Sequence, residues 1–167
     1  WFEVDRAARV LRAWMGEASS HRGFRYRGLA WQPDPLHPVG IVRAGVMLEG
    51  RWFDGAQPEE LRRCGCSFDP ALPFPQINYS WGALQGAVMQ AELLRRAGWP
   101  VYAWGQRALY RAVRWLEQDA NFPARGDDAW LVYAINAATA SDFSAPEPGA
   151  LELGKNAGFT DWTHPRR

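Results

Sequence analysis

Cysteine is scarce in this chain, with only two among its 167 residues. Cys64 and Cys66 are separated by one residue, a spacing that would strain a mutual disulfide, and no other cysteine could complete a disulfide framework. A lone Cys-x-Cys also lacks the second ligand pair of a zinc site. We therefore expect small buried thiols and no metal, and the cysteines leave the redox compartment undetermined.

Long apolar runs, a secretion leader and excess charge are also lacking. No apolar run approaches the length of a membrane span, and no charged-then-apolar leader opens the chain. The sequence starts at Trp1, without Met, and enters a helical pattern almost at once, so we expect it to be part of a longer protein. The chain has 19 Lys and Arg residues and 18 Asp and Glu residues, so its net charge is +1. A charge this close to zero argues against a nucleic-acid partner.

Lysine is nearly absent, since only Lys155 among the 19 basic residues is not arginine. Arginine favours forked contacts with carboxylates, although a high-GC genome gives the same bias without any function.

Tryptophan, by contrast, is abundant, with ten residues. Ten indoles exceed the usual need of such a core, so we expect several to line a wet cleft; the alternative is an aromatic-rich helical core.

Apolar residues recur at helical spacing in several segments, which predicts an all-α protein forming one domain over residues 1–167. The predicted helices are Val4–Glu17, Tyr79–Ala97, Gln106–Gln118 and Asp128–Thr139. A short link after Gly98 makes the second and third an antiparallel hairpin. The last is apolar nearly all round and should be central, with Asp127 or Asp128 capping its start.

The remaining segments break this periodicity. Prolines and glycines forbid long regular elements in residues 19–77, apart from a short helix or strand over Gly40–Leu48. The helical core is predicted over 78–139, and 140–167 is an aromatic and polar tail without helical period. Such a tail suits a carbohydrate groove, because aromatic faces pack on sugar rings while polar groups bind hydroxyls; it could equally pin the terminus onto the body.

Several short sequence segments resemble the C-terminal part of bacterial alginate lyase family proteins, from about Gly50 to the end. These segments are Glu59–Arg63 with Ser67-Phe68, Asn78–Ala87, Trp104–Leu109, Gly126–Trp130, and Gly154–Asn156 with Trp162–His164. The resemblance implies a fragment of an α/α toroid of the chondroitin AC/alginate lyase superfamily, built of helical hairpins with long irregular loops. It also implies a secreted or periplasmic location, an acidic polysaccharide as partner and no cofactor.

The better-studied lyases of that family carry an Asn-His pair on a toroid helix, and this chain has no such dipeptide. Whether the catalytic base lies in this chain therefore stays open. A lyase acting on a 4-linked uronate must neutralise the C6 carboxylate, remove the C5 proton and protonate the departing O4. Asn78 and Tyr79 open the longest predicted helix, where a helix N-terminus favours an anion, so we expect Asn78 to bind the carboxylate. The alternative is an N-cap Asn beside a packed Tyr.

Two histidines are candidates for the base. His164 follows Asp161 and Trp162, so an Asp could orient the imidazole while the indole stacks on a sugar. His21, with Tyr26 and Arg25 on one predicted loop, offers an alternative base, acid and carboxylate binder. Solvated loop residues are the simpler interpretation of that second cluster.

Further residues complete the predicted substrate-binding set. They are Arg25, Trp81, Trp104, Asn136, Lys155, Asn156 and Trp162. Trp104 could instead pack the turn between two helices, and the amide of Asn136 could serve a structural bond. The sequence thus predicts a polysaccharide lyase, with a glycan-binding or structural helical module as the alternative. A hydrolase is disfavoured, because Asp127 and Asp128 are adjacent and would not oppose one another across a substrate.

Overall fold

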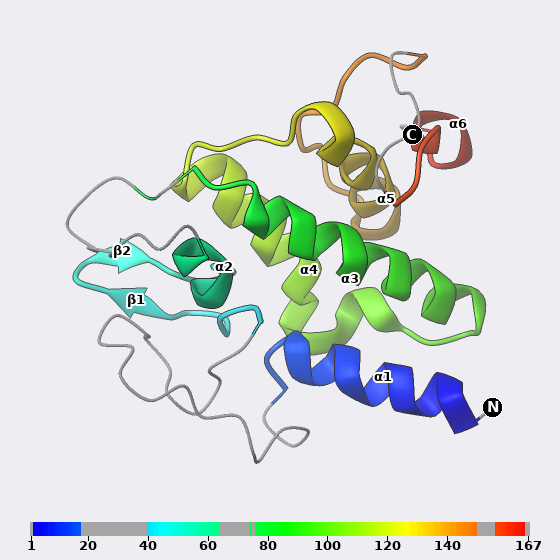
Figure 1. Ribbon diagram of the computed structural model, residues 1–167, viewed down its shortest axis with the longest axis horizontal. Helices are drawn as coiled ribbons and strands as arrows, with labels where there is room; N and C mark the ends of the chain where they lie inside the picture. The colour runs from blue at the N-terminus through cyan, green and yellow to red at the C-terminus, as the bar shows by residue number, and fades with distance from the viewer. Residues whose placement is uncertain (1, 18–39, 64–73, 75, 150–155, 166–167) are drawn as a thin grey trace.

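A computed structural model describes residues 2–17, 40–63, 74, 76–149 and 156–165. Over these residues the protein is predominantly helical, with one small antiparallel sheet (Figure 1). The all-α expectation is confirmed at this level. Several predicted residues lie outside the described ranges: His21, Arg25, Tyr26, Lys155, Cys64 and Cys66.

The longer helices fall close to their predicted ranges. They are α1 (Phe2–Trp14), α3 (Tyr79–Arg96), α4 (Trp104–Arg114) and α5 (Trp130–Thr139). In the Pro-rich region, strands β1 (Met47–Leu48) and β2 (Arg51–Trp52) pair antiparallel, and α2 (Pro58–Arg62) follows. The segment predicted as a short helix or strand therefore ends in a strand. Short helical turns occupy Val101–Ala103, Trp115–Asp119 and Gly126–Asp128.

Helix α3 is the element against which α1, α2 and α5 pack (Figure 1). Its apolar residues Trp81, Leu84 and Val88 are fully buried, as their helical spacing requires. Helix α5 is buried from Trp130 through Asn136, which confirms the prediction that this nearly all-apolar helix is central.

The predicted antiparallel hairpin is also confirmed. Gly98 adopts a left-handed φ of 90° just past α3, and the chain turns there into α4. The residues after α4 return to the start of α3, where the indole of Trp81 donates to the carbonyl of Phe122 at 3.1 Å. The side-chain amide of Gln76 donates to the carbonyl of Asn121 at 2.8 Å.

Asn78 occupies the N-cap position of α3, but its side chain makes no capping bond. Two local predictions are wrong. Asp128 does not cap α5, because its carboxylate accepts a hydrogen bond from the buried amide of Gln85 at 2.5 Å. The tail contains a short helix, α6 (Thr160–Thr163), where no helix was predicted.

Helix α4 begins differently from its prediction. Gly105, Gln106 and Arg107 have φ values of 55°, 57° and 60°, so the first turn is left-handed. A Cβ on Gly105 would lie 2.3 Å from the carbonyl oxygen of Met15, which explains the glycine there. Because the sequence has ordinary helical spacing, local periodicity does not account for this start.

Candidate functional site

Four side chains meet at the C-terminal end of α3, and we call them the Glu92 cluster: Glu92, Arg95, Tyr102 and His164. The Glu92 carboxylate accepts a hydrogen bond from Tyr102 Oη at 2.7 Å and from Arg95 Nη2 at 2.8 Å. His164 Nε2 lies 3.3 Å from Glu92 Oε2. Helix α3 supplies Glu92 and Arg95, the following turn supplies Tyr102, and α6 positions His164 directly after its end.

The charges of the cluster follow from these contacts. Burial alone would raise the pKa of Glu92, but hydrogen bonds to His164, Arg95 and Tyr102 hold that pKa well below its usual value of 4.5. Glu92 is therefore ionised at neutral pH. Burial, reinforced by the charge of Glu92, raises the pKa of Tyr102 far above its usual value of 10.0. The Tyr102 phenol therefore stays protonated and acts as a donor to Glu92.

His164 is fixed at both ring nitrogens. Its Nδ1 lies 2.9 Å from the hydroxyl of Thr163, and its side chain is 13% exposed. The sequence suggested Asp161 as the carboxylate that orients this ring, and that is wrong. Asp161 instead accepts a hydrogen bond from the main-chain nitrogen of Gly149 at 2.6 Å. Glu92, 72 positions away along the chain, takes the orienting role.

The C-terminal segment is anchored to the helices by side chains. The Asn156 amide donates to Gln85 Oε1 at 3.0 Å, and the Thr160 hydroxyl donates to the carbonyl of Trp130 at 2.6 Å. These bonds give Asn156 a role in pinning the terminus, which is the structural alternative that the sequence offered.

Two aromatic side chains on this anchored segment face solvent. Trp162 is 74% exposed and Phe159 is 44% exposed. Their rings lie 6.4 Å apart at 61°. An exposed indole on a segment fixed to the body offers a face on which a sugar ring can stack.

Other predicted catalytic residues lie far from His164. Asn78 and Tyr79 are at the opposite end of α3, about 20 Å from Glu92 along the helix axis. Tyr79 is exposed, with the guanidinium of Arg63 at 6.0 Å from its ring centroid. Asn78 and Tyr79 therefore lie too far from His164 for all three side chains to contact one sugar ring.

Two of the predicted stacking residues lie mostly inside. Trp81 is 0% exposed and belongs to the core, so the stacking role predicted for it is wrong. Trp104 is 8% exposed and contacts Trp99 edge-on at 5.8 Å, in agreement with the turn-packing alternative. Trp115 and Trp130 are buried too. These indoles form an aromatic-rich helical core.

Asn136 makes structural bonds. Its amide nitrogen donates to the carbonyl of Phe143 at 2.9 Å, and its oxygen accepts from the Ser141 hydroxyl and the Phe143 main-chain nitrogen. Because both ends of this amide are occupied, a substrate contact would require breaking one of these bonds.

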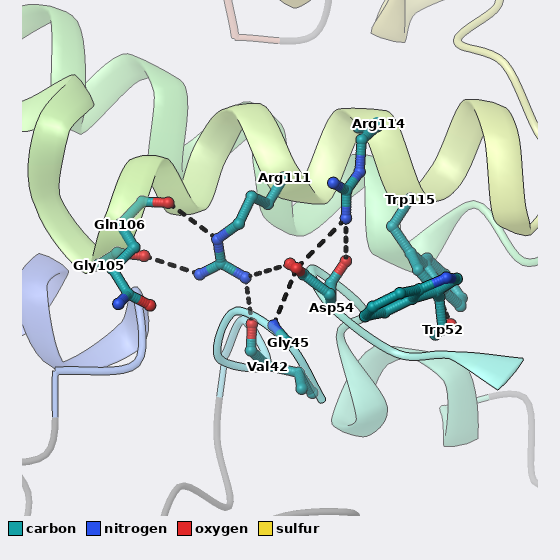
Figure 2. A network of polar contacts seen from close by, with 9 residues as sticks. All are labelled: Val42, Gly45, Trp52, Asp54, Gly105, Gln106, Arg111, Arg114 and Trp115. Carbon is teal, nitrogen blue, oxygen red and sulfur yellow. Dashed lines mark hydrogen bonds and ion pairs between the residues drawn. The ribbon is translucent and has the colours of Figure 1, made fainter. Parts of the chain in front are cut away.

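A depression at the surface, which we call the α1–α4 groove, has a volume of about 680 Å³. It is lined by Met15–Glu17, 43–46 and 103–106. Figure 2 shows a network centred on Arg111 and Asp54 that includes three of the lining residues, Gly45, Gly105 and Gln106. Arg111 Nη1 donates to Asp54 Oδ1 and to the carbonyl of Val42, both at 2.7 Å. The same guanidinium donates to the carbonyls of Gly105 at 2.7 Å and Gln106 at 2.9 Å.

This network explains the left-handed start of α4. Arg111 and Asp54 are both buried, and the main-chain nitrogen of Gly45 donates to Asp54 Oδ2 at 3.0 Å. Burial would raise the pKa of Asp54, but the bonds from Arg111 and Gly45 hold that pKa below its usual value of 3.8. Sequence reasoning missed this pair, because Arg107, Arg111 and Arg114 recur at the same helical spacing. No local signal separates the buried arginine from the other two.

Within the described part of the chain, no group of three or more His, Cys, Asp or Glu side chains could hold a metal ion. None of the described helices combines the length and apolar character needed to cross a membrane. No protein-family model matches the chain, and no curated protein or solved structure matches it at a significant level.

Proposed function

We propose that this chain is part of an α/α toroid protein that binds an acidic, uronate-containing polysaccharide and cleaves it by β-elimination. The observation that supports this proposal best is the position of His164. Its imidazole contacts the buried carboxylate of Glu92, and the exposed indole of Trp162 lies on the adjoining helix. A base and a stacking face are thus held on one segment.

In this mechanism the imidazole of His164 removes the C5 proton while Trp162 holds the ring. The imidazolium that forms is stabilised by the ionised carboxylate of Glu92. Arg95 is half-exposed, and its Nε and Nη2 donate hydrogen bonds to the carboxylate of Glu92. Its Nη1 is then able to donate to the C6 carboxylate of the substrate. Tyr102 is a poor proton donor because its pKa is raised, so the imidazolium returns the proton to O4 as the C4–O4 bond breaks and the C4=C5 double bond forms.

A second candidate function is a glycan-binding module without turnover. It is favoured by the bonds at both nitrogens of His164 and by the distance of Asn78 and Tyr79 from that ring. A base that must break a bond to Thr163 before it accepts a proton is less effective than a free one.

The test is to incubate the protein with alginate and other polyuronates and to record the absorbance of unsaturated uronate. We expect His164→Ala to lower kcat at least 100-fold, in the range of general acid–base catalysis. Trp162→Ala should raise KM, whereas Trp52→Ala, which removes an exposed indole on β2, should leave KM unchanged.

One outcome contradicts the role of His164 and another contradicts the lyase itself. Cleavage at equal rates by His164→Ala and the unmodified protein would place the base elsewhere. Saturable binding of oligouronates without any unsaturated product would support the glycan-binding module instead.

A further inference from the structure

The main chain is closely packed at three glycines, of which Gly16 and Gly105 line the α1–α4 groove. A Cβ on Gly40 would lie 1.9 Å from the carbonyl oxygen of Trp14, and one on Gly105 would lie 2.3 Å from that of Met15. A Cβ on Gly16 would lie 2.9 Å from the carbonyl oxygen of Ile41. The walls therefore meet main chain to main chain, and a ligand entering the groove would find it already formed.

The wall formed by α4 also holds conformational strain. A left-handed conformation is unfavourable for a non-glycine residue, and both Gln106 and Arg107 adopt it. Arg111 sustains the turn by donating to the carbonyls of Gly105 and Gln106, as Figure 2 shows. As a result, the exposed residue Gln106 is held at the groove. Strain that the surrounding structure sustains is concentrated at binding sites.

The lining carries a carboxylate, a guanidinium, an amide and an aromatic side chain. Glu17 is fixed by Arg12 Nε at 2.6 Å and by the main-chain nitrogen of Gly105 at 3.1 Å. Arg43 supplies a guanidinium, Gln106 an amide, and Trp104 the margin of an indole. Hydroxyls suit the carboxylate and the amide, while a sugar carboxylate suits the guanidinium. The volume of about 680 Å³ lies within the range of small-molecule sites.

We propose that the α1–α4 groove is a second binding site, separate from His164, for a short acidic oligosaccharide. Arg43 binds a sugar carboxylate, Glu17 and Gln106 bind hydroxyls, and Arg111 is a positioning residue that shapes the wall. This proposal rests on the acidic polysaccharide of the proposed function. In this proposal the groove binds the polymer, and His164 cleaves the glycosidic bond.

The test uses the ¹⁵N-labelled full chain carrying His164→Ala, so that the ligand is not cleaved. A saturated oligouronate is titrated while the amide signals of Gly45, Gly105 and Gln106 are recorded. We expect saturable shifts at all three. Arg43→Gln or Gln106→Ala should each weaken binding about tenfold, the loss of one charged or polar contact. Arg125→Gln, at an exposed arginine that does not line the groove, is the matched control and should not.

The outcomes separate this proposal from the lyase proposal. Absence of shifts with every oligouronate would overturn the groove proposal, whatever the cleavage assay shows. Equal shifts with a neutral oligosaccharide of the same length, unchanged by Arg43→Gln, would overturn the acidic ligand. Saturable shifts in a protein whose unmodified form yields no unsaturated product would support the groove and contradict the lyase.

Discussion

At the scale of single residues, two buried carboxylates organise the molecule. Asp54 binds Arg111 next to the α1–α4 groove. Glu92 binds Arg95, Tyr102 and His164 at the C-terminal end of α3. A carboxylate removed from water is stable only when hydrogen bonds replace its hydration. Both carboxylates meet this condition, and their lowered pKa values are the result.

Removal of the Arg111 guanidinium should be costly. We expect Arg111→Met to lower the free energy of unfolding by about 3–5 kcal/mol, because Asp54 would remain buried and charged without its main partner. Arg107→Met removes an exposed guanidinium from the same helix, with its hydrogen bond to the carbonyl of Thr139 and its contact with the Tyr110 ring, and should cost about 1 kcal/mol. Urea denaturation of the two variants measures the difference. Equal losses would contradict the role assigned to the ion pair.

At the scale of elements, α4 shows how a neighbour can override helix propensity. Residues after Trp104 have regular helical spacing, yet the first turn is left-handed because Arg111 binds its carbonyls and Gly105 lies against the end of α1. The strained backbone is retained because the surrounding contacts offset its cost.

Glycine substitutions test this explanation. Gly105→Ala should destabilise the protein by more than 1 kcal/mol, because its Cβ would collide with the main chain of Met15. Gly82→Ala, on α3 where a Cβ meets nothing within 4 Å, should stabilise it by about 0.5–1 kcal/mol. Thermal unfolding followed by circular dichroism compares the two. Stabilisation by both substitutions would mean that the α1–α4 contact is not tight.

At the scale of the whole molecule, the C-terminal segment is attached through polar bonds to α3 and α5. Asn156 contacts Gln85, Thr160 contacts Trp130, and His164 contacts Glu92. Because Glu92 is one of these anchors, the attachment depends on pH.

The sign of that dependence follows from the lowered pKa of Glu92. Its contribution to stability is present above the usual pKa of 4.5 and is lost as the pH falls toward the lower pKa of the folded state. Glu60, Glu117 and Asp119 act in the opposite direction: burial raises the pKa of each, so their contribution is present at low pH and fades as the pH rises. Asp54, whose pKa is lowered, acts in the same direction as Glu92. We expect the shift of Glu92 to dominate.

Unfolding measured between pH 7 and pH 3 checks this expectation. The free energy of unfolding should fall with the pH below about 4.5, and Glu92→Gln should flatten the decline. Glu3→Gln, at an exposed position of α1, should not alter it. A profile unchanged by Glu92→Gln would show that Glu92 does not link the C-terminal segment to pH.

Part of this architecture could be predicted from the sequence. The spacing of apolar residues gave α1, α3 and α5 to within a few positions, and the apolar surface of α5 predicted its central place. The sequence also singled out His164 and Trp162 as neighbours in the tail. It did not predict Glu92 as the partner of His164, because Asp161 offered a nearer carboxylate along the chain.

The sequence by itself determined where the longer helices form, because helical periodicity depends only on neighbours three and four positions away. The tertiary structure alone decided which charged groups pair. Asp54 and Arg111 are 57 positions apart, and Glu92 and His164 are 72 positions apart. Many equivalent carboxylates and guanidinium groups occur along the chain, so only the folded main chain selects those that are buried together.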